Sequence, residues 1–404
     1  MRFTYSQYIE IRERLDVLNN DQSHFQNSND ICTPMGCVEE MVNTIPRSFW
    51  RRKHIKVLDP CTGNGNFPAY VSTKIDVENI HFNEINPKRI AHLKSIFGKD
   101  INLTTKDFLT IDDEEEYDLI VCNPPYASFT ADGKRAAKNH NMSRDFILKA
   151  LQKTRRNGYI LFIVPDNWMS LSDRNNTVEI LSQYQFIHLN IHGAKKWFPK
   201  VGSSFTWFIL KKTPNVKSFT IENFYHTKSV NKARLTIGAR YIPLYFSEVV
   251  QSIFEKTIDA NNEKFGIETS SNLHKYTKKN NLSTEKTDKF KHRVQHTPTQ
   301  VVWSNIAHKF QSGYKVFISL TNKYGTFVEK GGMTQSIAFI KGKTKIEAEA
   351  LSAELNNEIY RFINNVTRYG NFNNIRILQK LPRLHDIHLT NEEMEIIIKY
   401  NDEY

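Results

Sequence analysis

Residues 55–67, IKVLDPCTGNGNF, join a short apolar strand to a turn that contains two glycines. Gly63 and Gly65 let backbone N–H groups of this turn approach a ligand closely. A lone Gly-x-Gly also fits an ordinary turn between a strand and a helix, so the neighbouring segments must decide its meaning.

Strands and helices alternate around this turn through the first half of the chain. We expect strands at 55–58, 79–84, 101–104, 117–122, 158–164, 186–191 and 205–210, with helices starting near 34 and 87 and one spanning 144–156. An uninterrupted apolar run such as 158–164 is typical of a strand that is covered on both faces. The alternation predicts an α/β fold with a doubly wound, mostly parallel sheet of seven strands.

Acidic side chains at the ends of these strands suit a nucleoside ligand. Glu84 lies about 20 residues after the glycine turn, where a carboxylate can accept hydrogen bonds from both hydroxyls of a ribose. A nicotinamide dinucleotide is disfavoured, because the third glycine of its fingerprint is missing and Asp59 would repel a pyrophosphate. S-adenosylmethionine, a zwitterion without phosphate, fits better. Asp107 and Phe108 can bind its adenine, although Asp107 taken alone is more simply a cap of a turn or helix.

Asn123-Pro124-Pro125-Tyr126 follows the strand at 117–122 directly. The two prolines fix φ and remove two backbone donors, so the carbonyls there have no strand to pair with. The Asn123 oxygen and the Pro124 carbonyl can accept the two N–H bonds of an exocyclic amine while Tyr126 stacks on the ring. The plainer alternative is a turn at a strand end.

Together these segments resemble the S-adenosylmethionine-dependent DNA amino-methyltransferases, in particular the adenine-N6 enzymes of restriction–modification systems. The resemblance covers residues 33–211, and the loop at 58–67 departs from it only where Thr62 and Asn64 replace small residues. It implies S-adenosylmethionine as cofactor. The implied cofactor-binding residues are Thr33, Pro34, Asp59, Pro60, Cys61, Gly63, Gly65, Phe67, Glu84, Ile85, Asp107, Phe108 and Asn123.

The same resemblance implies a catalytic motif and a second aromatic wall for the target base. Residues 123–126 match the family's catalytic motif without departure, and Phe198 in the segment 195–201 matches a later aromatic element. The alternative is that Phe198 is an ordinary core residue and that Trp197 stacks on the base. The order of motifs is the one called gamma, in which a C-terminal region reads the DNA. The implied catalytic residues are Asn123, Pro124, Pro125, Tyr126 and Phe198.

Composition bounds the other possibilities. With 404 residues the chain has room for about two to three domains. Its four cysteines form no Cys-x-x-Cys pair, which favours a reduced, cytoplasmic protein without a structural metal. The longest apolar run is too short to span a membrane, and the polar N-terminus argues against a secretory signal.

The rhythm of strands and helices changes after residue 213. We therefore expect a catalytic domain at 1–213 and an α+β target-recognition domain at 214–404. Most of the net charge of +12 lies in the segment 271–343, where 13 Lys and Arg face 3 Asp and Glu. Aromatic residues are interspersed there, which favours a nucleic-acid surface over a merely solvated lysine-rich face. The candidate DNA-contacting residues are Arg293, Lys315, Asn322, Lys323 and Gln335.

Two alternatives to a DNA methyltransferase stay open at this point. The partner we expect is double-stranded DNA, with a separate restriction endonuclease as a further possible partner. One alternative is an RNA methyltransferase that acts on a guanine or adenine amino group with the same motif. Another is a catalytically inactive DNA-binding modification subunit that has kept the motif. Cytosine N4 is disfavoured, because enzymes that methylate it generally carry Ser in place of Asn123.

Overall fold

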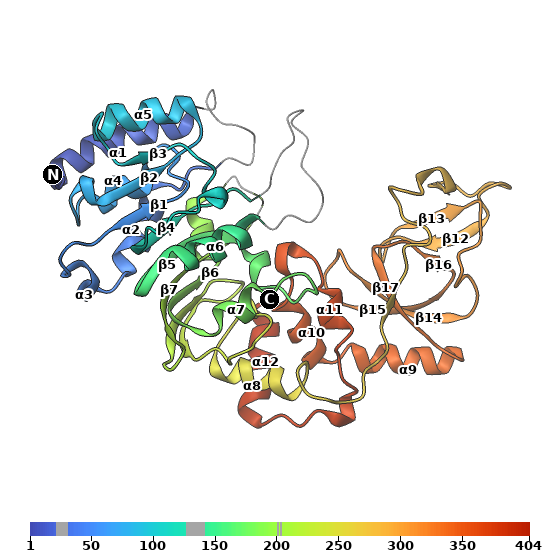
Figure 1. The fold of residues 1–404 in the computed structure, drawn as a ribbon. Coiled ribbons are helices and arrows are strands. Elements are labelled where there is room, and N and C mark those ends of the chain that lie inside the picture. The colour runs from blue at the N-terminus through green and yellow to red at the C-terminus, as the bar shows by residue number, and fades with distance from the viewer. Residues whose placement is uncertain (22–30, 127–141, 200–201, 203) are drawn as a thin grey trace. The chain divides into compact units, whose positions relative to one another are not determined.

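The computed structural model describes residues 1–21, 31–126, 142–199, 202 and 204–404 (Figure 1). The chain divides into two compact units. The first unit consists of Met1–Trp168 and Asn175–Arg240, and the second of Met169–Arg174 and Tyr241–Tyr404. The boundary expected at residue 213 therefore lies inside the first unit.

In the described residues, the first unit holds a nine-stranded sheet of order β3-β2-β1-β4-β5-β7-β6-β8-β9. Strand β7 runs antiparallel to both of its neighbours, whereas the strands from β3 to β5 are parallel. The expected α/β fold with a mostly parallel sheet is confirmed, and two strands extend it beyond the seven expected. The strands are β1 (Val57–Asp59), β2 (Ile80–Asn83), β3 (Leu103–Thr104), β4 (Tyr117–Cys122), β5 (Thr154–Pro165), β6 (Tyr184–Ile191), β7 (Phe205–Pro214), β8 (Phe219–Asn223) and β9 (Ser229–Ala233).

Helices cover this sheet as its alternating side chains require. Side chains of successive strand residues point to opposite faces, and Leu119, Val121, Leu161 and Ile163 share one buried cluster with α1, α2, α4 and α5. On β4 and β5 the intervening residues are buried as well, as expected of central strands. The helices of the first unit are α1 (Tyr5–Asn20), α2 (Met35–Thr44), α3 (Arg47–Trp50), α4 (Asn66–Val71), α5 (Pro87–Phe97), α6 (Met142–Lys153) and α7 (Thr177–Leu181).

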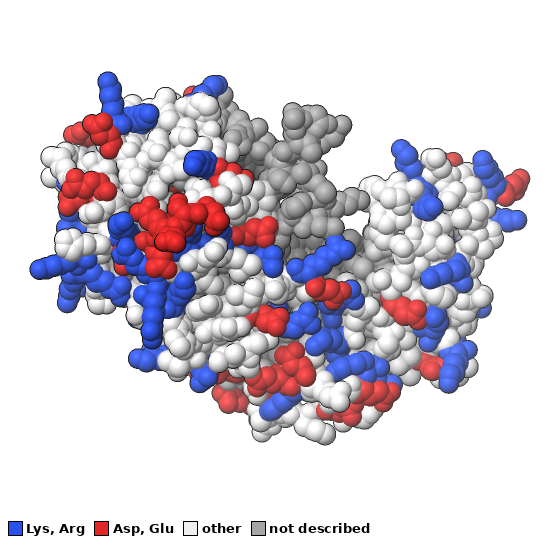
Figure 2. Space-filling view, in the orientation of Figure 1, with Lys and Arg blue, Asp and Glu red and all other residues white. Residues whose placement is uncertain are grey.

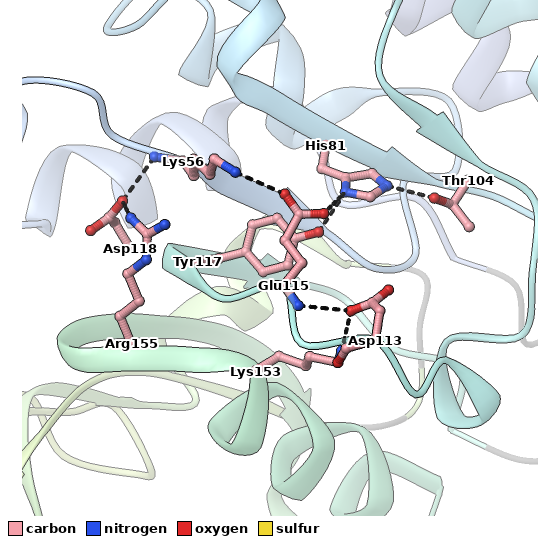
Figure 3. Close-up of polar contacts among 9 residues, drawn as sticks. All are labelled: Lys56, His81, Thr104, Asp113, Glu115, Tyr117, Asp118, Lys153 and Arg155. Carbon is pink, nitrogen blue, oxygen red and sulfur yellow. Dashed lines mark hydrogen bonds and ion pairs between the residues drawn. The ribbon is translucent and has the colours of Figure 1, made fainter.

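A network of ion pairs lies where β4 and β5 begin (Figure 3). Arg155 contacts Asp118 at 2.9 Å, and the same carboxylate accepts a hydrogen bond from the backbone N–H of Lys56, just before β1, at 2.9 Å. Lys153 pairs with Asp113, and this hydrogen bond holds the pKa of Asp113 below its usual value. The network ties the first residues of three adjacent strands together.

The second unit is α+β, as expected. Its two four-stranded sheets have the orders β10-β17-β14-β15 and β11-β13-β12-β16. Their strands are β10 (Glu268–Thr269), β11 (Leu282–Ser283), β12 (His292–Gln295), β13 (Val301–Ser304), β14 (Tyr314–Ser319), β15 (Thr326–Lys330), β16 (Gly332–Met333) and β17 (Ile337–Lys341). The helices are α8 (Glu248–Lys256), α9 (Lys345–Leu355), α10 (Glu358–Asn365), α11 (Ile375–Leu378) and α12 (Asn391–Glu403).

The described residues contain neither a membrane-spanning helix nor a cluster of metal-binding side chains. None of the helices there has both the length and the apolar character needed to cross a membrane. The same part of the chain holds no group of three or more His, Cys, Asp and Glu side chains placed to bind a metal ion.

Candidate active site

The residues expected to bind the cofactor meet at one edge of the sheet. Strand β1 pairs in parallel with β2 on one side and with β4 on the other. The carboxyl ends of parallel strands lie at the same edge, which is where open α/β sheets bind their ligands. Asp59, Glu84 and Asn123, which end or follow these three strands, are therefore brought together as the sequence predicts.

The turn after β1 has the backbone geometry that its glycines predict. Gly63 and Gly65 have φ of 58° and 98°, in the left-handed region that side chains disfavour. A Cβ atom on Gly65 would also lie 2.6 Å from Cε2 of Phe97 on α5. Only glycine fits at position 65 without displacing the side chains of Phe97 and Leu93.

Glu84 closes the glycine turn from the neighbouring strand. Its Oε2 accepts a hydrogen bond from the Gly63 N–H at 2.8 Å, and its Oε1 accepts one from the Asn86 N–H at 2.8 Å. Burial raises the pKa of Glu84 and raises that of Asp59 well above its usual value. Each carboxylate oxygen has a second lone pair, so Glu84 retains acceptors for a ribose while it holds the turn.

Thr33 connects the glycine turn to the motif at 123–126. The backbone carbonyl of Thr33 accepts a hydrogen bond from Nδ2 of Asn66, at the start of α4, at 2.7 Å. Its hydroxyl Oγ1 accepts one from Nδ2 of Asn123 at 3.0 Å. Thr33 is buried, with an exposed fraction of 3%, so both contacts are shielded from water. The sequence points to Thr33 but not to this bridging geometry.

The amide of Asn123 is half-buried, and its orientation is set by two acceptors. Nδ2 donates to the carbonyl of Ile31 at 2.9 Å and to the Thr33 hydroxyl. Both amide hydrogens are thereby used, which leaves Oδ1 as the acceptor end of the group. Oδ1 accepts a hydrogen bond from the hydroxyl of Tyr126. Within the same motif Pro124 is buried and Pro125 is exposed.

Aromatic rings continue from Tyr126 into the sheet. The ring of Phe205, on β7, lies 5.7 Å from that of Tyr126 and 4.8 Å from that of Phe198. Phe198 is 4% exposed and belongs to the buried cluster of the first unit. Trp197 instead contacts α2, where its Nε1 donates to Glu40 at 3.0 Å. Phe205, which the sequence analysis does not single out, stands between the two expected stacking residues.

The remaining expected cofactor residues are placed as follows. Asp107 is exposed, and its carboxylate accepts a hydrogen bond from the Leu109 N–H at 3.0 Å, which caps the short turn Phe108–Thr110. Phe108 is buried against Phe146 of α6, with ring centroids 5.7 Å apart. Ile85 is 54% exposed next to Glu84. The others lie in or beside the glycine turn or at the start of α2, and are Pro34, Pro60, Cys61 and Phe67.

A buried pair at the same edge of the sheet is not anticipated by the sequence analysis. Asp166 follows β5, His192 follows β6, and Nε2 of His192 lies 2.9 Å from Oδ2 of Asp166. His192 has a φ of 64°, a conformation that costs roughly 1–2 kcal/mol for a residue with a side chain. A polar residue directly after each apolar strand is the signal that would have pointed to this pair.

The expected DNA-contacting residues occupy different environments in the second unit. Asn322 and Lys323 are exposed, and Arg293 is half-buried and pairs with Glu329 at 3.2 Å. Gln335 accepts a hydrogen bond from the Lys275 N–H at 2.9 Å. Lys315 differs from the expectation, because it is 1% exposed and its ammonium donates to the carbonyls of Ser312 and Gly313. Burial lowers the pKa of Lys315 to about 8. Its two hydrogen bonds stabilise the start of β14.

The residues around the glycine turn fit S-adenosylmethionine. The Oδ1 atoms of Asn64, Asn66 and Asn83 are buried and have no hydrogen-bond partner among the described residues. Buried acceptors without a partner are costly, so a ligand that brings N–H groups would satisfy them. The methionine ammonium and the adenine amino group of S-adenosylmethionine are donors of this kind. The two carboxylates, Asp59 and Glu84, match its positive charges.

Part of the first unit is similar to a known protein family. Residues 38–198 match the model of the Eco57I restriction-modification methylase family. The chain is 24% identical over 235 residues to the type II methyltransferase M.HincII of Haemophilus influenzae, a match that covers 54% of this chain and 44% of that protein. It is 26% identical over 129 residues to the type II methyltransferase M.AccI of Acinetobacter calcoaceticus, covering 28% of this chain and 24% of that protein. The chain spans less than half the length of these relatives.

A solved structure has a similar fold across both units. It is the ATP-dependent type ISP restriction-modification enzyme LlaBIII bound to DNA, with a TM-score of 0.51 and 12% identity, covering 98% of this chain and 41% of that one. The resemblance to restriction–modification methyltransferases expected from the sequence is confirmed by the family match. The family implies S-adenosylmethionine as the cofactor.

Proposed function

We propose that this protein is a sequence-specific DNA methyltransferase that transfers a methyl group from S-adenosylmethionine to the N6 amino group of a flipped-out adenine. The orientation of the Asn123 amide carries the proposal. Because Ile31 and Thr33 engage both hydrogens of Nδ2, Oδ1 is fixed as an acceptor at the carboxyl end of β4. An acceptor there suits the N–H of a planar exocyclic amine.

The chemistry that this arrangement favours is direct transfer to nitrogen. S-adenosylmethionine supplies, when bound, an electrophilic methyl group. An adenine amine is a poor nucleophile, since its lone pair is delocalised into the ring. Hydrogen bonds from its two hydrogens to Asn123 Oδ1 and the Pro124 carbonyl would localise the lone pair on nitrogen and direct it toward the methyl. The chain then contributes mainly proximity and orientation, and the proton leaves after transfer.

Thr33 supports the proposal because it fixes the acceptor relative to the cofactor turn. One residue accepts hydrogen bonds from both Asn66 and Asn123. A change in the position of the cofactor turn is therefore transmitted to the acceptor directly. This coupling matters because a transfer that relies on orientation slows when the acceptor is displaced slightly from the methyl donor.

The target base must leave the duplex to reach this site, at a cost of a few kcal/mol. Tyr126 offers an aromatic face, and stacking of this kind contributes about 1–3 kcal/mol per base. We propose Tyr126 as the first stacking ring and the row of Phe205 and Phe198 behind it as its support, so that Phe198 reaches the base only if this row rearranges. We propose that the second unit, through its basic segment 271–343, binds the DNA and reads its sequence. A cognate restriction endonuclease is a further proposed partner inside the cell.

Labelled methyl transfer tests the proposal. The protein is incubated with S-adenosylmethionine carrying a tritiated methyl group and with duplex DNA, and the product nucleosides are separated. We expect N6-methyladenine, and we expect Asn123→Ala to lose transfer while it binds S-adenosylmethionine with unchanged Kd. Label in N4-methylcytosine, or label transferred preferentially to a structured RNA competitor, would contradict the substrate. A wild-type rate in Asn123→Ala would contradict the mechanism.

A further inference from the structure

One turn in the second unit presents an aromatic ring to solvent among lysines. Tyr276 is 74% exposed, more than almost every other large apolar or aromatic side chain that the structure describes. Single exposed apolar residues are common on proteins and by themselves indicate nothing. The surroundings of Tyr276 set it apart. The segment 271–280 contains three lysines, Lys275, Lys278 and Lys279, and no acidic residue.

Hydrogen bonds within the turn fix its backbone. The N–H of Lys278 donates to the carbonyl of His274 at 2.8 Å. Nδ1 of His274 accepts from the N–H groups of Tyr276 and Thr277, at 3.3 and 3.4 Å. The imidazole therefore takes the place of a backbone acceptor within the turn. The turn is held in one conformation although its tip is exposed.

Lys275 anchors this turn to the body of the second unit. Its N–H donates to Oε1 of Gln335 at 2.9 Å, and its ammonium lies 2.9 Å from Nε2 of His296. Nδ1 of His296 contacts the hydroxyl of Thr334 at 2.8 Å, and the His296 side chain is buried. Burial and the adjacent Lys275 lower the pKa of His296, which keeps the ring neutral and able to accept from the ammonium. Lys275 is thus committed to the anchor.

Lys278 and Lys279, in contrast, are exposed next to Tyr276. Figure 2 shows basic side chains spread over the part of the face that carries β12–β17, with fewer acidic ones among them. A turn with an exposed ring and two exposed cations combines two elements that bind duplex DNA, an apolar surface for a base edge and ammonium groups for phosphates.

We propose that the turn His274–Lys279 is a DNA contact, in which Tyr276 packs against a base of the recognition sequence and Lys278 and Lys279 bind flanking phosphates. This inference rests on the proposed function, since it names part of the surface that reads the DNA. Gln335 and His296 position the turn through Lys275 and do not themselves contact DNA. A pre-organised turn favours binding because little conformational entropy is lost when the ring is immobilised.

Three variants of the full-length protein separate the roles of these residues. Tyr276→Ala removes the ring, Tyr276→Phe keeps it, and a double variant Lys278→Ala, Lys279→Ala removes the cations. Tyr5→Ala serves as the matched control, because Tyr5 is 72% exposed on α1 in the first unit. The probe is a fluorescent 30-base-pair duplex that contains the site this protein methylates, identified by sequencing methylated bases in DNA from cells that express it.

Binding is measured by fluorescence anisotropy between about 50 and 200 mM salt, a range over which phosphate contacts change affinity strongly. Loss of one base contact predicts that Tyr276→Ala binds the duplex roughly 5- to 150-fold more weakly with an unchanged salt slope. Tyr276→Phe and Tyr5→Ala should bind like the wild type. The double lysine variant should reduce the slope of log K against log salt by about 1.8, which corresponds to two phosphates.

The outcomes distinguish this inference from the function on which it rests. If the wild type binds and methylates duplex DNA but Tyr276→Ala binds equally well, the turn is not a contact and the proposed function stands. An unchanged salt slope in the double variant overturns the phosphate role of the two lysines. If the wild type neither binds nor methylates duplex DNA, both the function and this inference are wrong.

Discussion

The hydroxyl of Tyr126 and the carboxamide oxygen of Asn123 are joined by a hydrogen bond within one motif. The acceptor that we propose for the target amine is therefore engaged by a neighbouring side chain in this structure. Burial raises the pKa of the Tyr126 phenol, so at neutral pH this group remains a donor. An arriving amine must share Oδ1 with the hydroxyl or displace it.

Tyr126→Phe separates the hydroxyl from the ring. The variant keeps a flat stacking face and leaves Oδ1 unoccupied, at the expense of one hydrogen bond worth about 1 kcal/mol. We expect kcat to be unchanged or raised by up to about fivefold, whereas Tyr126→Ala should impair base flipping. Steady-state kinetics and the fluorescence of a base analogue at the target position measure the two effects. Equal loss of activity in both variants would show that the hydroxyl itself takes part in the reaction.

Thr33→Val tests the bridge between the cofactor turn and the catalytic motif. Valine has a similar shape but no hydroxyl, so one Nδ2 hydrogen of Asn123 loses its acceptor. A buried donor without a partner costs about 1–3 kcal/mol, which allows a loss of roughly 5- to 150-fold in kcat. Thr33→Ser restores the hydroxyl and should recover most of the activity. If Thr33→Val is fully active, the orientation of Asn123 does not depend on Thr33.

Binding of S-adenosylmethionine should release protons. Burial raises the pKa of both Asp59 and Glu84 in the free protein. These carboxyls destabilise the free protein as pH rises from their ordinary pKa values to the raised ones, and a cationic ligand lowers the raised values again. Cofactor affinity should therefore increase with pH over that window. Calorimetry in two buffers of different ionisation enthalpy measures the released protons, and Glu84→Gln should reduce their number.

Gly36→Ala should destabilise the first unit although alanine favours helices. A Cβ atom on Gly36 would lie 2.4 Å from Cη2 of Trp197, whose indole is held by Glu40. Overpacking costs about 1–3 kcal/mol, whereas alanine gains at most about 1 kcal/mol in a helix, so the net change should be destabilising. Thermal unfolding measures it, with Gly325→Ala as control because its Cβ would meet nothing within 4 Å. A stabilised Gly36→Ala would mean that Trp197 is free to move away.

Sequence patterns anticipated the elements and contacts that depend on local order. The apolar runs located the parallel strands, and the ends of these strands necessarily gather Asp59, Glu84 and Asn123 at one edge. The left-handed backbone of Gly63 and Gly65 follows equally from their position after a strand. The carboxylate of Asp107 caps the turn that follows, which is one of the two roles expected for it, and its contact with adenine stays a prediction.

Contacts between distant segments could not be anticipated in this way. Thr33 and Asn123 are 90 positions apart, and nothing local specifies that their side chains meet. The polar residues after β5 and β6 signal that Asp166 and His192 lie at one edge, but their pairing across the intervening β7 depends on a strand order that differs from the sequence order. From its residue type, Lys315 was expected at the surface. Lys315 and the buried Phe317 are two positions apart on β14, so their side chains point to the same face of the sheet. The spacing of the two residues predicts a buried side chain at position 315, but a lysine is rarely expected to be buried.

The continuation of the first sheet through β8 and β9 has a practical consequence for dissecting this protein. Strand β8 pairs with β6, so a fragment that stops at residue 213 would leave the edge of β6 exposed. Open edges of this kind recruit other strands and promote aggregation. A separable first unit must extend to Arg240, and because Met169–Arg174 belongs to the other unit, that fragment also needs a short replacement linker at this point. Exchange of the second unit between related proteins would have to respect the same two junctions.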